Sequence, residues 1–376
     1  MADPKATLAN WRTAPHNRWA FHHVRELVPS ADIPNDPRRI RELEHRPADF
    51  SGLRIDPDAG EPLSLERFLQ ETDTDGFLIL HRGRLVFEYY GNGMTDQAPH
   101  ILMSVSKSML GLLFDALGVD AGQPAAAFIP QLEATAYRDA TLRHLLDMRA
   151  AIAFDEDYLA TAGPIIEYRK ATGWNPLGPG ESPSDLHSFY ATLKETDGKH
   201  GGRFHYVSPN TDLLGWVIEE ATGRRFAELM SELVWKPAGA ERSAYVTVDR
   251  LGAPRCAGGM CATLRDLARV GQWMMETQAG FLEDLETHGD PQAWAAGDLV
   301  AYYPRLPMRY RNHWYVLDGE APLAFGMGIH GQNLFVDRLN GIVIAKLSSQ
   351  ALPLDAARMA LTMQAVSRMR AYLAHR

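Results

Sequence analysis

The stretch Met103-Ser104-Val105-Ser106-Lys107-Ser108-Met109-Leu110-Gly111-Leu112-Leu113-Phe114 places a hydroxyl and an amine one helical turn apart. Residues three apart share a helix face, so Ser104 and Lys107 can touch. An alcohol needs a neighbouring base to take its proton, and an amine is neutral enough for this when it is buried. The apolar neighbours favour Ser104 as nucleophile and Lys107 as base. The alternative is a solvated lysine on a helix that begins with a buried serine.

The composition is that of a globular, acidic protein. The 376 residues are 45% hydrophobic and carry a net charge of −9, so a basic footprint for nucleic acid is absent. Without a membrane-spanning run or an apolar signal core, we expect no membrane contact and a cytoplasmic location. Cys256 and Cys261 lack Cys-x-x-Cys spacing, and the 14 His include no His-Glu-x-x-His, so no metal or cofactor is expected.

Strand patterns come from both ends of the chain. Two apolar runs at 77–80 and 85–89 are joined by a short segment with a Gly, which predicts a hairpin. Two more, at 333–336 and 342–347, are joined at Asn340-Gly341, which is the strongest short hairpin signal. These four runs predict an antiparallel sheet.

Helical spacing dominates the middle of the chain, between Ser104 and residue 234, and returns in a final amphipathic helix after Pro353. This order predicts an α/β (more strictly α+β) fold with an antiparallel sheet flanked by helices and an all-helical subdomain. We expect a sheet domain formed by 1–103, including an N-terminal extension, with 235–376. The helical domain would be 104–234, and the active site would lie at the junction of the two.

A second candidate for proton transfer is Tyr206, which precedes the helix signals Ser208, a predicted N-cap, and Pro209 at the first helical position. A phenol at this turn can point into a cleft and pass protons if a nearby ammonium lowers its pKa. The alternative is a partly buried tyrosine that anchors the loop.

The glycine-rich segment Gly326-Met327-Gly328-Ile329-His330-Gly331-Gln332 formally matches a dinucleotide-binding pattern, but that pattern must open a helix and here a strand follows. We therefore expect the glycines to let the strand backbone approach a ligand closely. Acyl transfer needs two backbone N–H groups aimed at the developing oxyanion. The amides of Ser104 and Gln332 are the predicted donors.

The order of three motifs along the chain resembles that of the serine β-lactamase-like hydrolases. The motifs are Ser104 with Lys107, then Tyr206 with Ser208, then His330-Gly331-Gln332 before a C-terminal helix. This family includes class C β-lactamases, family VIII carboxylesterases and 6-aminohexanoate-dimer hydrolases. The N-terminal Asn17-Arg18-Trp19-Ala20-Phe21 and the loop from Glu156-Asp157-Tyr158 to Gly173-Trp174 are most similar to the last group. The resemblance implies a β-lactamase/transpeptidase-like fold, with substrate contacts from Tyr158, Trp174, Ser208 and His330.

The function expected on these grounds is that of a serine hydrolase, an amidase or carboxylesterase. It would cleave small linear amides or esters through an acyl-enzyme in which Lys107 and Tyr206 move the proton. Which of these two residues is the base is left open. Whether the protein forms a homodimer is also left open. The strand carries Ile329-His330-Gly331 where β-lactamases usually have Lys-Thr-Gly, so β-lactams are not expected substrates. The alternatives are a carboxylesterase or weak β-lactamase of the same fold, or a catalytically silent binding or sensor relative.

Overall fold

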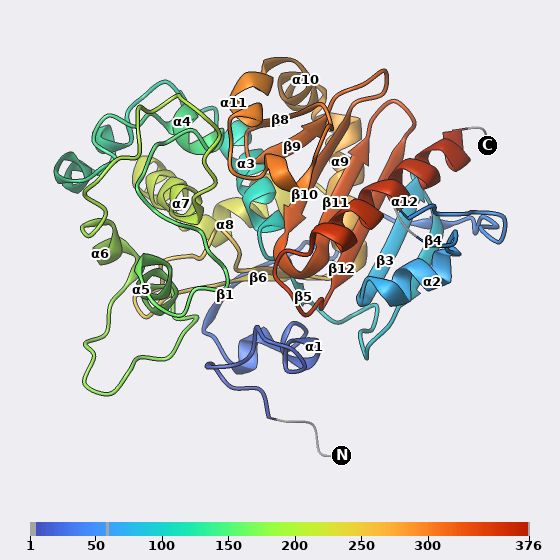
Figure 1. Cartoon of the computed structure of the whole chain (residues 1–376), viewed down its shortest axis with the longest axis horizontal. Helices are drawn as coiled ribbons and strands as arrows, with labels where there is room; N and C mark the ends of the chain where they lie inside the picture. The colour runs from blue at the N-terminus through green and yellow to red at the C-terminus, as the bar shows by residue number, and fades with distance from the viewer. Residues whose placement is uncertain (1–4, 58–59, 375–376) are drawn as a thin grey trace.

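An eight-stranded sheet is the larger of the two sheets in the structure, a computed structural model that describes residues 5–57 and 60–374 (Figure 1). The strand order is β2-β4-β3-β12-β11-β10-β9-β8, antiparallel except for the short pair β2 and β4. The strands are β2 (Glu44–His45), β3 (Thr74–His81), β4 (Arg84–Tyr90), β8 (Met308–Arg311), β9 (Trp314–Leu317), β10 (Leu323–Gly328), β11 (Gln332–Asp337) and β12 (Ile342–Ser348).

Helices cover both faces of this sheet. Leu78 and Leu80 of β3 pack into the core on the face that carries α9 (Leu264–Thr277), whereas Phe77 and Ile79 join the core beneath α12 (Ala356–Ala374). Figure 1 shows α12 lying across the front of the sheet with α9 behind it. Because side chains alternate between faces and both faces are buried, β3 reads as a continuous apolar run.

The middle of the chain is helical. Between Ile101 and Ala244, a segment described throughout, there is no strand of either sheet. The helices are α3 (Val105–Leu117), α4 (Leu142–Leu146), α5 (Pro164–Ala171), α6 (Leu186–Tyr190), α7 (Ser208–Thr222) and α8 (Phe226–Met230), with short helices η2 (Ala125–Ala127), η3 (Pro130–Ala134) and η4 (Ser231–Trp235). Helix α3 packs against both α7 and β10, which brings its first turn to the boundary between helices and sheet.

A four-stranded sheet, ordered β1-β6-β7-β5, lies beside that boundary. The sequence did not predict it, because its strands have only two to four residues each. They are β1 (Ser30–Ile33), β5 (His100–Ile101), β6 (Ala244–Thr247) and β7 (Met260–Ala262). The remaining elements are α1 (Asn17–Ala20), η1 (Val24–Glu26), α2 (Leu65–Glu71), α10 (Ala279–His288), α11 (Pro291–Ala295), η5 (Val300–Tyr302) and η6 (Ile329–Gly331).

The antiparallel sheet flanked by helices is confirmed, and so are both predicted hairpins. Gly341, between β11 and β12, has φ of +66°, as the Asn-Gly signal requires. One local prediction is wrong: α7 starts at Ser208 itself and its N-cap is Val207. The division into two domains stays a prediction. No helix within the described ranges is both long and apolar enough to cross a membrane.

Candidate active site

Ser104 and Lys107 meet at the start of α3. Lys107 Nζ lies 2.8 Å from Ser104 Oγ, 3.1 Å from Ser208 Oγ and 2.8 Å from the carbonyl oxygen of Ala257. The amine is therefore fixed between the nucleophile candidate and two groups that follow it by more than 100 residues in the chain.

The surroundings of Lys107 lower the pKa of its ammonium group, so that it can lose its proton near neutral pH. The side chain is only 1% exposed, and burial together with the charge of Arg255 lowers its pKa to about 7, against the opposing attraction of Glu156 and Asp212. Desolvation penalises the ammonium form because a charge loses its hydration. A substantial fraction of Lys107 is thus neutral at pH 7 and able to accept a proton.

The backbone around Ser104 is tightly packed. Met103, just before it, has φ of +45°, a left-handed conformation that is strained for a non-glycine residue. A Cβ added to Gly328 of β10 would lie 2.9 Å from the backbone N of Ser104, and one added to Gly326 would lie 2.7 Å from Ser108 Oγ. The predicted close approach of the glycine strand is therefore present, and it is directed at the first turn of α3.

Tyr206 is the third member of the group. It is 6% exposed, its hydroxyl interacts with the nearby Ser104 side chain, and Lys107 Nζ lies 4.8 Å from its ring centroid. Asp298 accepts hydrogen bonds from the backbone N of Tyr206 (3.1 Å) and from His205 Nδ1 (2.7 Å), which anchors the turn before α7. Burial raises the pKa of Tyr206 well above its usual value. The condition of a lowered pKa is thus not met, because desolvation outweighs the lowering by the charge of Arg255.

Two hollows adjoin the nucleophile candidate. A narrow pocket is lined by Ser104, Tyr158, Trp174, Ser208 and Ile329, among others. A wider, more open cleft is lined by Tyr206 and Asp298, and it shares Glu156 and Tyr158 with the pocket. The structure therefore brings the predicted residues Tyr158, Trp174 and Ser208 to the site.

Comparisons with known proteins agree with this geometry. A model of the Beta-lactamase family matches residues 65–367. The chain belongs to the beta-lactamase family. It is 35% identical to the 6-aminohexanoate-dimer hydrolase of Paenarthrobacter ureafaciens over 356 residues, 91% of this chain and 88% of the relative. The predicted family and hydrolase class are confirmed: this is a beta-lactamase-fold serine hydrolase.

Solved structures show the same fold. The "Putative 6-aminohexanoate-dimer hydrolase from Bacillus anthracis" superimposes with a TM-score of 0.88 at 24% identity and covers 99% of this chain and 98% of its own. EstCE1, a hydrolase with promiscuous acyltransferase activity, gives a TM-score of 0.60 at 15% identity over 82% of this chain and 98% of its own. The β-lactamase/transpeptidase-like fold predicted from the sequence is therefore confirmed.

The structure places two predicted site residues of this beta-lactamase-family chain away from the pocket. Gln332 is fully buried, and its amide side chain accepts from the backbone N of Ser348 (2.9 Å) and donates to its carbonyl (2.7 Å). His330 is 2% exposed, with Nδ1 2.7 Å from the carbonyl oxygen of Gln350. The reason is the turn η6, where His330 has φ of +63° and Gly331 of +91°. This turn leaves Ile329 at the pocket and carries Gln332 into the next strand.

Sequence reasoning also missed a buried ion pair behind Lys107. Asp212 on α7 pairs with Arg255, accepts from the hydroxyl of Tyr168, and accepts from the backbone N of Ala257 at 2.7 Å. Because the carbonyl of Ala257 contacts Lys107, this pair holds the base in place. Asp212 and Arg255 are 43 residues apart, and no local pattern links them.

Glu156 is a further residue of the site, quoted above only as the start of a family-like loop and not as a site residue. Its two carboxylate oxygens accept from the hydroxyl (2.6 Å) and the backbone N (2.9 Å) of Ser208, at the positive end of α7. Ser208 therefore links Glu156 to Lys107 rather than capping its helix.

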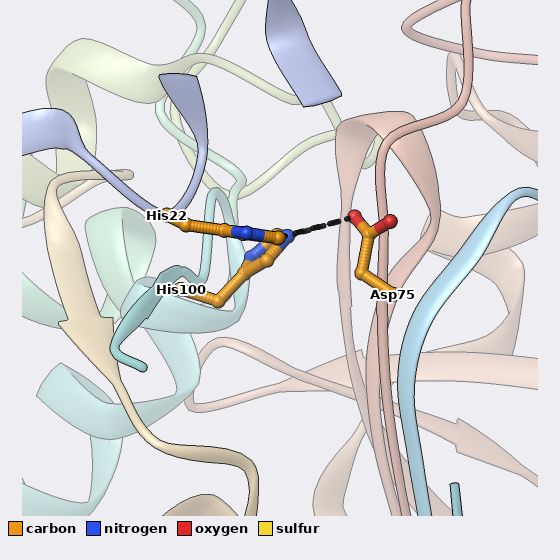
Figure 2. Close-up of side chains that lie close together, drawn as sticks. All are labelled: His22, Asp75 and His100. Carbon is orange, nitrogen blue, oxygen red and sulfur yellow. Dashed lines mark hydrogen bonds and ion pairs between the residues drawn. The ribbon is translucent and has the colours of Figure 1, made fainter. Parts of the chain in front are cut away.

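One cluster with metal-ligand chemistry lies outside the pocket. His22, Asp75 and His100 each offer a ligand atom, all within 4.8 Å of one another (Figure 2). Asp75 Oδ2 lies 3.1 Å from His100 Nε2 and 3.9 Å from His22 Nε2, while its Oδ1 accepts from Asn92 and Ser349. The cluster joins the N-terminal extension to β3 and β5. The expected absence of a metal stays a prediction.

This cluster makes the fold sensitive to acid. Burial lowers the pKa of His22, and although burial alone would raise that of Asp75, hydrogen bonds from His100 and Asn92 and the proximity of His22 hold it below its usual value. Both groups thus bind fewer protons folded than unfolded, so the free energy of unfolding falls as the pH falls below the unfolded histidine value of 6.5, and again as Asp75 protonates.

We expect His22→Asn to flatten the stability curve, measured by urea unfolding, between pH 7 and 5. His23→Asn, the adjacent residue, should leave that slope unchanged. Equal slopes in the wild-type protein and His22→Asn would contradict the assignment. A melting temperature that rises on addition of Zn²⁺ would instead identify the cluster as a metal site.

Proposed function

We propose that the chain hydrolyses small linear amides or esters through an acyl-enzyme on Ser104. The observation that carries this proposal is the contact of Ser104 Oγ with Lys107 Nζ at 2.8 Å inside a buried site, with the hydroxyl of Tyr206 close to the same serine. Ser104 Oγ attacks the carbonyl carbon, the bond to the leaving group breaks, and water then releases the acid.

Lys107 is the base that takes the proton of Ser104 in this proposal. Its pKa of about 7 suits a base at neutral pH, whereas the raised pKa of Tyr206 keeps the phenol protonated. Tyr206 passes the proton on to the leaving group, which it faces from the open cleft. The two groups act on one proton path and titrate as a coupled pair.

The backbone amides of Ser104 and Ile329 are the proposed oxyanion donors. Both residues line the pocket, and the backbone of Gly328, just before Ile329, packs against the amide of Ser104. Each donor aimed at the developing oxyanion is worth roughly 3 kcal/mol of barrier.

The substrate class follows from similarity and from the pocket. A relative named 6-aminohexanoate-dimer hydrolase at 35% identity and the aromatic residues Tyr158 and Trp174 that line the pocket beside Ser104 both support a small, linear amide or ester. A carboxylesterase or weak β-lactamase activity uses the same groups. The cytoplasmic location and the homodimer stay predictions.

Activity-based labelling tests this proposal. A fluorophosphonate probe should add its mass to a single peptide that contains Ser104, and Ser104→Ala should remove the label. Ser108→Ala is the matched control, because Ser108 is also buried on α3 but donates to the carbonyl of His313. Label on Ser104→Ala would exclude Ser104 as the nucleophile. Binding of acylated compounds without turnover of any short ester would favour a silent sensor.

A further inference from the structure

Three arginines line the same pocket as Ser104. They are Arg12 from the N-terminal extension, Arg169 from α5, and Arg255 from the loop before β7. Among the residues that line this pocket, Glu156 is the one carboxylate. A pocket with this composition has an excess of positive charge beside the reacting serine.

Arg255 forms a direct ion pair, whereas Arg169 is attracted by Glu156 and Asp157 without forming one. Arg255 pairs with the buried Asp212. Arg12 donates to Asn175 Oδ1 at 2.5 Å and lies over the rings of Trp11 and Trp174, and Arg169 donates to the carbonyl of Tyr158 at 3.1 Å. Over residues 5–57 and 60–374, neither Arg12 nor Arg169 forms an ion pair with a carboxylate.

The pocket is also short of hydrogen-bond acceptors. The buried Nε atoms of Arg12 and Arg255 have no partner in the described structure, and Arg169 is 8% exposed. Burial and repulsion by Arg169 and Arg255 lower the pKa of Arg12 to about 9. Buried guanidinium groups without a carboxylate are costly, so they mark a place where an anion can bind.

We propose that Arg12 and Arg169 bind a carboxylate carried by the acyl part of the substrate. The preferred substrates are then half-amides or half-esters of short dicarboxylic acids. This inference rests on the proposed function of Ser104. Planar guanidinium groups suit carboxylate oxygens because they can donate two parallel hydrogen bonds.

The acyl part is assigned to the arginine pocket by the position of Tyr206. In the proposed mechanism Tyr206 delivers the proton to the leaving group, and it lines the open cleft rather than the arginine pocket. In that cleft Asp197 and Asp298 pair with Arg203, but Asp155 and Asp157 add further negative charge, which disfavours a second carboxylate there. The leaving group therefore occupies the acidic cleft and the acyl chain the arginine pocket.

The reaction needs no further reactant. The bond between Ser104 Oγ and the carbonyl carbon forms, the bond to the amine or alcohol breaks, and the proton of Ser104 passes through Lys107 and Tyr206 to the leaving group. Water then cleaves the acyl-enzyme and releases the dicarboxylate, while its proton restores Ser104.

A matched set of aryl esters tests the proposal. We expect kcat/KM for the mono(4-nitrophenyl) ester of glutarate to exceed that for 4-nitrophenyl pentanoate, a neutral chain of equal length, by about 10- to 100-fold. The cationic 5-aminopentanoate ester should be the slowest. Arg169→Met and Arg12→Met should each lower the ratio of anionic to neutral ester turnover, and Arg169→Lys should retain part of it.

The control variant is Arg138→Met, whose arginine is exposed and pairs with Glu133, and it should keep the wild-type ratio. Because Arg169 is buried, the folding of each variant is checked by circular dichroism, and Arg12→Met gives a second, independent reading. This inference would be overturned, and the proposed function kept, if the wild-type protein is labelled at Ser104 but turns over all three esters equally or prefers the cationic ester. If no ester were cleaved and Ser104 were not labelled, the proposed function would fail with it.

Discussion

Lys107→Met is expected to lower kcat for a short aryl ester by about 100- to 10,000-fold, the range for loss of a general base. Methionine keeps the length and apolar character of the stem, so the core around α3 stays filled. What is lost is the group 2.8 Å from Ser104 Oγ that takes its proton. Stopped-flow measurement of the acylation burst should show that acylation is slowed.

The dependence of kcat/KM on pH tests the same role of Lys107. Lys107 accepts a proton only when neutral, and its pKa is about 7. The kcat/KM of the wild-type protein should therefore fall about tenfold per pH unit below 7 and level off above it, and this limb should disappear in Lys107→Met.

Lys346 provides a matched control for that limb. It is fully buried on β12 and burial also lowers its pKa to about 7, yet it does not line the pocket. Lys346→Met should keep the acidic limb, with folding checked by circular dichroism. If the limb instead followed Lys346, or survived in Lys107→Met, Lys107 would not be the base.

Asp212→Ala is expected to lower the free energy of unfolding by about 3–5 kcal/mol, because it leaves Arg255 as an uncompensated buried charge. Asp212 is 1% exposed and also accepts from the hydroxyl of Tyr168 and the backbone of Ala257. Urea unfolding measures the change. Activity should fall as well, since Ala257 holds Lys107 through its carbonyl.

The control for this change is Glu133→Ala, which removes a carboxylate from the exposed pair with Arg138. Exposed pairs contribute little because water screens both charges, so stability should hardly change. Similar losses from Asp212→Ala and Glu133→Ala would show that burial does not decide the strength of the Asp212 pair.

Much of the fold follows from local patterns. The hairpins around residues 81–84 and 340–341 and helix α3 were predictable because alternation, turn glycines and helical spacing act over a few residues. The short strands of the smaller sheet were not, since two to four residues carry no periodicity.

The candidate site, like the fold, was only partly predictable from the sequence. The order of Ser104, Lys107 and Tyr206 in the sequence was sufficient to propose a nucleophile and its proton path. The position of Ile329, the second proposed oxyanion donor, was not predictable, because the turn at His330 and Gly331 decides which residue faces the pocket, and that turn depends on backbone conformation.

The sequence by itself determined the residue types of the chemistry, an alcohol and an amine one helical turn apart, and the strands and helices that carry them. Only the tertiary structure decided whether the amine of Lys107 is neutral and which charges surround it. The pKa of Lys107 depends on Glu156, Asp212 and Arg255, and the positive pocket depends on Arg12. These residues converge from distant parts of the chain, and desolvation and Coulomb interactions act through space rather than along the sequence.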